Sequence, residues 1–354
     1  MKKEDKELFV PGRLCLFGEH SDWAGGHRRQ NPNIERGYTL IAPTNQGNYA
    51  NVKRIDKPIF RFSSKKFGES LETKLDKEEL LRIAEEGGLF SYVAGVAHEI
   101  VASYINCKNY GIEIDNYKTD LSIKKGLSSS ASICVLTAKA FNEIYNLGFT
   151  DKRIMELAYL GETATPSRCG KMDQACVFDS PVLMTFDGDR INAERLEIGK
   201  DLHLLIVDLK KEKDTVKILA DLNQGFPWPN TDLEKKKHEY FKVINPRIIS
   251  RTIDAFSKGN AQEIGELMIE AQVNFDKYLM PSCEELKAPI LHSVLKMPEI
   301  QDYIYGGKGV GSGGDGSAQI ICKSKEDREK VRKILIAKKF ECLSLDLKKT
   351  SFNK

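Results

Sequence analysis

The chain has 354 residues, which is too long for one small core and predicts two domains. Charged residues make up 30% and hydrophobic residues 41%, a balance typical of a soluble globular protein, and a net charge of +3 argues against a nucleic-acid surface. No apolar stretch approaches the ~20 residues that span a membrane, and the charged N-terminus lacks the apolar segment of a signal peptide. We therefore expect a cytoplasmic monomer or homodimer without nucleic-acid or membrane partners.

The eight cysteines are scattered along the chain and form no CxxC pair. Several of them lie in apolar runs, and the six histidines show no metal-ligand spacing either. This pattern favours buried, reduced thiols over disulfides or a zinc site.

The first half of the chain alternates predicted strands with predicted helices. Strands are expected at Phe9–Phe17, Tyr38–Thr44 and Ile59–Phe62. The helical periodicity of Leu89–Tyr104 includes small residues, which indicates a closely packed neighbour. Two further helices are predicted, at 129–146 and 151–162.

The pattern changes near residue 185, and we place the boundary of two lobes there, 1–185 and 186–354. Beyond it the periodicity predicts helices at 233–257, 261–278, 282–296 and 326–338, strands at 203–208, 318–322 and 340–345, and a glycine-rich loop at 306–316. The lysines at 235–237 are expected on a solvated helix face. The pattern as a whole predicts an α+β protein.

A serine-rich turn is the first candidate for binding a ligand. Gly126 opens a tight turn, and Ser128, Ser129 and Ser130 begin an apolar run with helical spacing. A helix N-terminus carries unpaired N–H groups and partial positive charge, so it attracts phosphate. The alternative is a cluster of N-capping serines with no ligand.

A polar cluster follows the first strand. Arg13 lies inside an otherwise apolar run, where a charge needs an anionic partner. After Gly18, the side chains of Glu19, His20 and Asp22 are able to hydrogen-bond several hydroxyls of a small polyol. The alternative is chance clustering at a strand end.

Two acidic residues are candidates for phosphoryl transfer. Glu162 ends a helical run and Asp173 follows a glycine turn. Such chemistry needs one carboxylate to bind Mg²⁺ and another to orient a hydroxyl. Taken alone the pair is weak, because 51 acidic residues make chance pairs common.

A glycine-rich segment, residues 306–316, has seven glycines in eleven residues, which allows its backbone to approach a ligand closely. It formally matches the dinucleotide-binding pattern, but a strand-like run follows instead of a helix. A Walker A motif is also absent, because Gly309 follows Lys308. A flexible loop is the alternative.

Together these segments closely resemble the GHMP kinases, the family of galactokinase, homoserine kinase, mevalonate kinase and phosphomevalonate kinase. Their order and spacing match across nearly the whole chain: residues 11–22 resemble the first family motif, 126–131 the second and 309–314 the third. The resemblance implies a two-lobed fold with an N-terminal mixed α/β lobe and a C-terminal ferredoxin-like α+β lobe.

The resemblance also implies the cofactors ATP and Mg²⁺ and a role for each matching residue. Asp173 would orient or deprotonate the acceptor hydroxyl, and Arg13 would stabilise the transferring phosphoryl group. Mg²⁺ would be held by Ser130 and Glu162. The residues expected to bind the ATP phosphates are Lys125, Gly126, Leu127, Ser128, Ser129, Ser130 and Ala131. Those expected to bind the acceptor are Glu19, His20, Asp22, Gly311, Gly313 and Gly314.

The motifs depart from the family pattern at three points. The proline that usually precedes the second motif is absent, and Lys124 and Lys125 stand there. In the third motif Val310 replaces an alanine, and Asp315 stands where cysteine is common. The full-length galactokinase signature is also incomplete and the chain is compact for that enzyme, so galactose itself is not the predicted acceptor.

We predict an ATP-dependent kinase that acts on a sugar or sugar derivative, at its anomeric hydroxyl. A mevalonate-type or other non-sugar kinase is the alternative within the family, and a catalytically inactive regulator that binds sugar or nucleotide is the alternative outside it. Several cations suggest an anionic group on the acceptor: His27, Arg28, Arg29, Arg168 and Lys171. For Arg28 and Arg29, a place on a surface loop is the favoured alternative.

Overall fold

The computed structural model describes residues 5–104, 110–121, 128–167 and 169–350. Its contacts divide the chain into two compact units, which we call the first unit, Met1–Arg13 with Pro43–Asp179, and the second unit, Leu14–Ala42 with Ser180–Lys354.

Two long strands cross this division, β1 (Lys6–Phe17) and β2 (Gly37–Ile55), so each supplies residues to both units. Contacts therefore group residues 14–42 with the C-terminal part of the chain. The lobes 1–185 and 186–354 stay a prediction about the family's domains.

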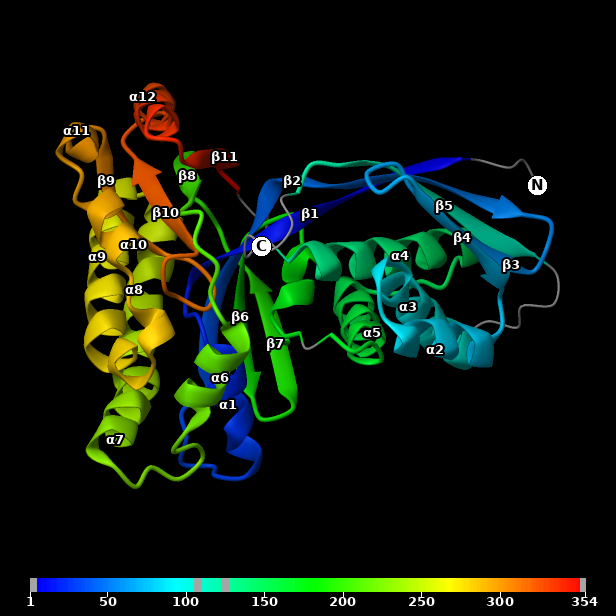
Figure 1. Ribbon diagram of the computed structural model, residues 1–354, viewed down its shortest axis with the longest axis horizontal. Coiled ribbons are helices and arrows are strands. Elements are labelled where there is room, and N and C mark those ends of the chain that lie inside the picture. Colours follow the sequence, from blue (N-terminus) through cyan, green and yellow to red (C-terminus); the bar gives the residue numbers. More distant parts are fainter. Residues whose placement is uncertain (1–4, 105–109, 122–127, 168, 351–354) are drawn as a thin grey trace. The chain divides into compact units, whose positions relative to one another are not determined.

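The first unit is built on strands in the order β4-β3-β5-β2, and β1 pairs with β2. β3 runs parallel to β5 and antiparallel to β4. Helices α2 to α5 lie together on one side of these strands (Figure 1). The bounds are β3 (Ile59–Ser64), β4 (Glu69–Lys74), α2 (Lys77–Glu86), α3 (Leu89–Tyr104), β5 (Gly111–Thr119), α4 (Ser129–Tyr145), α5 (Asp151–Thr163) and the short helix η2 (Asp173–Val177).

Helices α3 and α5 pack closely because each presents a glycine to the other. A Cβ on Gly95 would lie 2.2 Å from the carbonyl oxygen of Gly161, and a Cβ on Gly161 would lie 2.4 Å from the backbone nitrogen of Val96. The close neighbour predicted for the small residues of Leu89–Tyr104 is therefore confirmed, and it is α5. Glu162 follows Gly161 at this close contact, and its side chain is fully buried.

The second unit contains an antiparallel sheet in the order β11-β8-β10-β9. It also contains β6, which pairs with the first residues of β2, and β7, which pairs with β6. Helices α8 and α9 pack side by side, and α9 contacts β9 and β10 of this antiparallel sheet (Figure 1). The strands are β6 (Val182–Asp187), β7 (Arg190–Arg195), β8 (Leu202–Asp208), β9 (Ile304–Gly309), β10 (Ser317–Cys322) and β11 (Glu341–Leu347). The helices are α1 (Ser21–Gly26), α6 (Thr215–Asn223), α7 (Asp232–Glu239), α8 (Asn245–Lys258), α9 (Ala261–Tyr278), α10 (Pro289–Leu295), α11 (Pro298–Gln301) and α12 (Lys325–Ala337). The π-helical segment η3 (Tyr240–Ile244) joins α7 to α8, and η1 (His27–Arg29), η4 (Met280–Ser282) and η5 (Glu284–Leu286) are short 3-10 helices.

The predicted α+β class is confirmed, and so are three of the predicted helices. Those expected at 129–146, 151–162 and 261–278 are α4, α5 and α9, with ends that differ by one residue at most. No helix within the described residues is both long and apolar enough to cross a lipid bilayer.

Two predicted elements are wrong in part. The helix expected at 282–296 is split into η4, η5 and α10, which starts at Pro289 because the residue before a proline disfavours the helical conformation. The loop expected at 306–316 begins later, because Gly306, Gly307 and Gly309 lie in β9 and pair with β10. Glycine composition alone does not show that a strand partner is available.

The prediction of a solvated face for the lysines at 235–237 is wrong for Lys237. Its side chain is 1% exposed, and its ammonium donates to the carbonyl oxygens of Asp221, Leu222 and Gln224, at 3.2, 3.1 and 2.5 Å. The carbonyls of Asp221 and Leu222 belong to the last turn of α6 and that of Gln224 follows it directly, where the macrodipole is negative and oxygens lack helical partners. The lysine therefore holds the end of α6 against α7.

We expect Lys237→Met to lower the free energy of unfolding by about 1–3 kcal/mol, since three buried carbonyls lose their donor. Urea unfolding followed by circular dichroism measures the change. The matched control is Lys236→Met on the same helix, at an exposed position, with a change below about 0.5 kcal/mol. Equal effects from the two substitutions would show that Lys237 does not support α6.

Candidate active site

The serine turn lies at the start of a long helix, as predicted. Ser129 is the first residue of α4, and Ser128 precedes it with a left-handed backbone, φ +52°. The first turn of α4 contains Ser130 and Ala131, so its unpaired N–H groups suit a phosphate. Lys125, Gly126 and Leu127, which were also expected to bind ATP, lie outside the described residues.

Arg13 is buried in β1 and meets the anion that its position required. Its Nη2 donates to Oδ1 of Asp173, the first residue of η2, and forms an ion pair with it. The Arg13 side chain is 8% exposed and that of Asp173 is 21% exposed. The structure thus brings together two predicted catalytic residues that are 160 positions apart, with the carboxylate partly open to solvent.

Glu162 is fully buried near the end of α5. Its Oε2 accepts a 2.8 Å hydrogen bond from Nε2 of Gln174, in η2. Burial raises the pKa of Glu162 to about 7, with a further rise from the charge of Asp173, while the hydroxyl of Ser130 and the amide of Gln174 lower it in part. The Glu162 carboxyl is therefore close to Ser130, its expected partner in holding Mg²⁺, and to Asp173, the expected catalytic carboxylate.

The donor set of the first unit fits a magnesium ion that is shared with a ligand. Glu162 Oε1 is buried and has no hydrogen-bond partner of ordinary length in the described chain, so one oxygen is available beside the Ser130 hydroxyl. Within the described ranges, no three His, Cys, Asp or Glu side chains gather as a metal cage. Mg²⁺ ordinarily takes one or two protein ligands and completes its shell with phosphates and water, which matches this arrangement.

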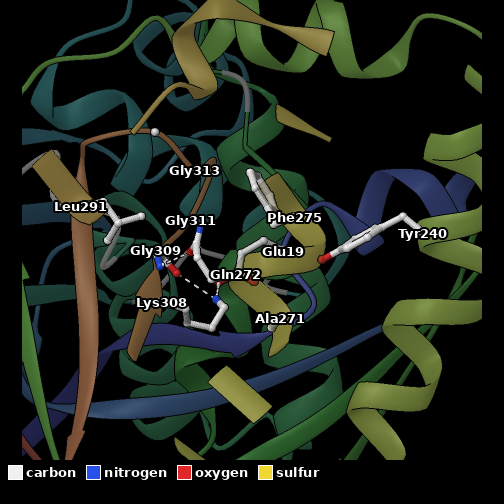
Figure 2. A pocket seen from close by; sticks show the side chains of 11 residues that line it. Glu19, Tyr240, Ala271, Gln272, Phe275, Leu291, Lys308, Gly309, Gly311 and Gly313 are labelled. Atoms are coloured by element: carbon white, nitrogen blue, oxygen red, sulfur yellow. Dashed lines mark hydrogen bonds and ion pairs between the residues drawn. The ribbon is translucent and has the colours of Figure 1, made fainter. Parts of the chain in front are cut away.

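The second unit contains a pocket whose empty space, counted together with the open solvent at its mouth, is about 310 Å³. Figure 2 shows the Glu19 carboxylate and the Lys308 ammonium at its centre, and Tyr240 directed toward them from the side. The lining residues come from the segment after β1, from η3, α9, α10 and β9, and from the glycine loop: Glu19, Tyr240, Ala271, Gln272, Phe275, Leu291, Lys308, Gly309, Gly311, Gly313 and Gly314.

A buried ion pair organises this pocket. Nζ of Lys308 donates to Oε1 of Glu19, and each side chain is 6% exposed. Nζ also donates to the Gly309 carbonyl at 2.8 Å. Gln272 accepts from the Gly309 N–H at 2.7 Å and donates to Asp276, so the last residue of β9 is held on both sides (Figure 2). The pocket therefore presents fixed polar atoms on a rigid strand end.

His20 has a left-handed backbone at the start of α1 and a buried ring. Its Nδ1 faces the indole Nε1 of Trp23 at 3.1 Å, and its Nε2 faces the Ser312 carbonyl at 3.2 Å. An indole N–H only donates, so Nδ1 accepts and the imidazole proton is on Nε2. Burial lowers the pKa of His20 to about 4, in agreement with a neutral ring, and both of its nitrogens are engaged within the protein.

We expect acid to destabilise the protein through His20. Between pH 6.5 and about 4 the unfolded chain binds a proton that the buried ring does not, so stability is complete above this window and falls as the pH drops through it, by about 3 kcal/mol. The measurement is urea unfolding of the wild type and of His20→Gln between pH 4 and 8. The difference in unfolding free energy between the two proteins should change with pH over this window; a constant difference would contradict the buried neutral ring.

The glycine loop has the backbone that its composition predicts. Gly311, Gly313 and Gly314 have φ of +69°, +86° and +66°. A Cβ on Gly314 would lie 2.5 Å from the Glu285 carbonyl oxygen, and one on Gly313 would contact the Phe275 ring at 2.8 Å. Lys213 donates to the carbonyl of Gly313, and burial lowers the pKa of this ammonium to about 8.

The structure accounts for one departure from the family motif. Asp315 is buried, and its Oδ1 accepts a 2.9 Å hydrogen bond from the Leu291 N–H in the first turn of α10. A cysteine at this position would be a poor acceptor, so aspartate caps a helix here. Val310, the other departure in this motif, is buried next to the end of β9.

The other polar residues predicted for the site in the second unit are buried or contact neighbouring side chains. Asp22 is buried in the first turn of α1. Arg28 pairs with Asp187 at 2.6 Å and Arg29 with Asp189 at 3.1 Å, while His27 contacts Asn223 at 2.8 Å. The favoured expectation that the arginines belong to surface structure agrees with these pairs. Arg168 lies outside the described residues.

Sequence reasoning missed several residues of the two sites: Gln174, Lys213, Tyr240, Gln272 and Lys308. Only Lys308 left a signal, as a lone cation in a run of glycines. The others are ordinary polar residues on helices or loops, and their roles depend on contacts with distant segments.

The chain is similar in sequence and fold to several known proteins. Residues 91–180 match the family model of the GHMP kinases N terminal domain. A galactokinase of Pyrococcus furiosus is 26% identical over 92% of this chain and 90% of its own length, and one of Thermotoga petrophila is 23% identical over 96% and 95%. Among solved structures, a mevalonate kinase of Methanococcus jannaschii has a TM-score of 0.75 at 20% identity, covering 98% of this chain and 99% of that one. A Lactococcus lactis galactokinase complexed with galactose has a TM-score of 0.72 at 18% identity, covering 99% and 95%.

The fold and these similarities define the class: the chain is an ATP-dependent phosphotransferase with an alcohol group as acceptor. The match of residues 91–180 to the GHMP kinases and the likeness of the whole fold to solved kinases of that group confirm the resemblance and the fold predicted from the sequence.

Proposed function

We propose that this protein transfers the γ-phosphoryl group of ATP to the anomeric hydroxyl of a sugar or sugar derivative. The main support is the pocket of the second unit, which is lined by the polar side chains of Glu19, Gln272 and Tyr240. Such fixed acceptors and donors suit the hydroxyls of a polyol better than an apolar acceptor. The galactokinases that match over most of the chain support the same acceptor class.

In the first unit, the N-terminus of α4 would bind the ATP phosphates through the backbone N–H groups of its first turn, with the serine hydroxyls beside them. Asp173 would accept the proton of the attacking hydroxyl or orient that hydroxyl. Arg13 would place positive charge on the transferring phosphoryl group, and its ion pair with Asp173 keeps the two groups adjacent.

Ser130 and Glu162 would hold Mg²⁺. The ion, when bound, neutralises the charge of the phosphates. Gln174 orients the Glu162 carboxylate through its 2.8 Å hydrogen bond, which leaves Oε1 for the ion.

Release of ADP across a panel of acceptors tests this proposal. Neutral sugars, uronic acids, sugar phosphates, inositols and mevalonate are each supplied with ATP and Mg²⁺. We expect turnover with at least one sugar or sugar derivative. Turnover with mevalonate alone would overturn the sugar assignment, and binding of nucleotide or sugar without turnover would overturn catalysis itself.

A further inference from the structure

A directional chain of hydrogen bonds links Trp23 to the glycine loop. The Trp23 indole donates to Nδ1 of His20 at 3.1 Å, and Nε2 of His20 faces the Ser312 carbonyl at 3.2 Å. Both ends of the chain have one role only, because an indole N–H donates and a carbonyl accepts. The indole therefore fixes the imidazole as the tautomer with its proton on Nε2. With the proton on Nδ1, two N–H groups would face each other at one end and two lone pairs at the other.

The surroundings hold Trp23 in the orientation that this chain needs. Its ring meets Phe226 and Phe241 edge-on, with centroids 5.2 and 5.5 Å apart, and His27 at 6.2 Å. His20 itself is 4% exposed and lies against Phe275, with ring centroids 6.2 Å apart. Aromatic side chains in such contacts lose little further entropy on making a hydrogen bond.

The chain ends on the loop that lines the acceptor pocket. Ser312 lies between Gly311 and Gly313, which both line that pocket and both have positive φ. Glycines at these positions permit many backbone conformations, so the loop needs tethers to keep one. Among the described residues, His20 contacts the Ser312 carbonyl and Lys213 the consecutive Gly313 carbonyl, while the Thr215 hydroxyl lies 3.4 Å from that of Ser312.

We propose that Trp23 is a positioning residue for the acceptor: by fixing the tautomer of His20, it holds the Gly311–Gly314 loop in the conformation that lines the pocket. This inference rests on the proposed function only in taking the pocket to be the acceptor site. A protonated Nε2 donates a hydrogen bond to the Ser312 carbonyl. The other tautomer would present a lone pair to this carbonyl, so the loop would lose this hydrogen bond. Trp23 does not touch the acceptor in this scheme.

The test compares Trp23→Phe, which removes the indole donor and keeps an aromatic ring, with Trp228→Phe. Trp228 is the second of the two tryptophans in the chain and is 58% exposed, so it is a matched control. We expect Trp23→Phe to raise the KM of the acceptor about three- to tenfold, the range for one lost hydrogen bond, with kcat and the KM of ATP nearly unchanged. Trp228→Phe should leave all three constants unchanged.

Nitrogen-15 NMR of the histidines provides a readout that does not depend on turnover. The signal missing from His20→Gln identifies His20; in the wild type it should report a proton on Nε2, and in Trp23→Phe a mixture of tautomers. If the protein has no sugar kinase activity, this spectrum still decides the claim about the tautomer. A signal that is the same in both proteins would overturn the inference.

A double-mutant cycle checks that the effect passes through His20. The amide of His20→Gln has no tautomers, so adding Trp23→Phe to that variant should change the acceptor KM by less than about twofold. If the two substitutions instead multiply their effects on KM, Trp23 acts on the pocket by another route and the positioning role is wrong.

Discussion

Asp173→Asn should lower kcat by about 10²- to 10⁴-fold while the affinity for ATP changes little. The amide keeps the size of the side chain and a hydrogen-bonding oxygen for Arg13, but it does not accept the proton of the acceptor hydroxyl. Positioning groups that remain, including the start of α4, still bind the nucleotide. Steady-state kinetics with a coupled ADP assay, together with calorimetric titration of ATP, measure both quantities.

The matched control for this substitution is Asp232→Asn. That side chain is 95% exposed at the start of α7, and its loss should leave kcat within about twofold of the wild type. Turnover of Asp173→Asn close to that of the wild type would show that another group activates the hydroxyl. Loss of ATP binding along with kcat would mean that Asp173 supports the nucleotide site instead.

Lys308→Met is expected to lower the free energy of unfolding by about 3–5 kcal/mol, because it leaves the Glu19 carboxylate buried without its cation. The double variant Glu19→Gln with Lys308→Met removes both charges, so it should recover most of that loss. Urea unfolding of the four proteins in this cycle gives the coupling between the two residues.

A surface ion pair provides the comparison for the buried one. Lys287 and Glu284 lie 2.6 Å apart with side chains 64% and 79% exposed, and Lys287→Met should change stability by less than about 1 kcal/mol. If Lys308→Met were as mild, or if the double variant were as unstable as the single one, the ion pair would not organise the pocket.

The parts of the site that the sequence predicts are those with a local physical signature. Three such signatures conflict with ordinary packing: a run of serines before an apolar helix, an arginine inside an apolar strand, and a cluster of glycines. Arg13 is the clearest example, since a charge in that strand required an anion and the structure supplies Asp173. The long helices were predictable for the same reason, because their periodicity extends over many residues.

The missed parts depend on segments that are distant in the sequence. Lys308 and Glu19 are 289 positions apart, and Ser312 and His20 are 292 apart, so no local pattern connects them. Lys237 has the charge pattern of an exposed helix face, and only the nearby end of α6 explains its burial. Gly306 and Gly307 have the composition of a loop, yet β10 supplies their strand partner.

The most direct test of the proposed reaction is the position of the phosphate in the product. The acceptor that supports ADP formation from ATP is prepared with carbon-13 at C1, and the phosphorylated product is observed by phosphorus NMR. We expect a phosphorus signal split by coupling to the labelled carbon, as a phosphate on the anomeric oxygen requires. A product signal without that splitting would place the phosphate on another hydroxyl and contradict the anomeric kinase proposed for this protein.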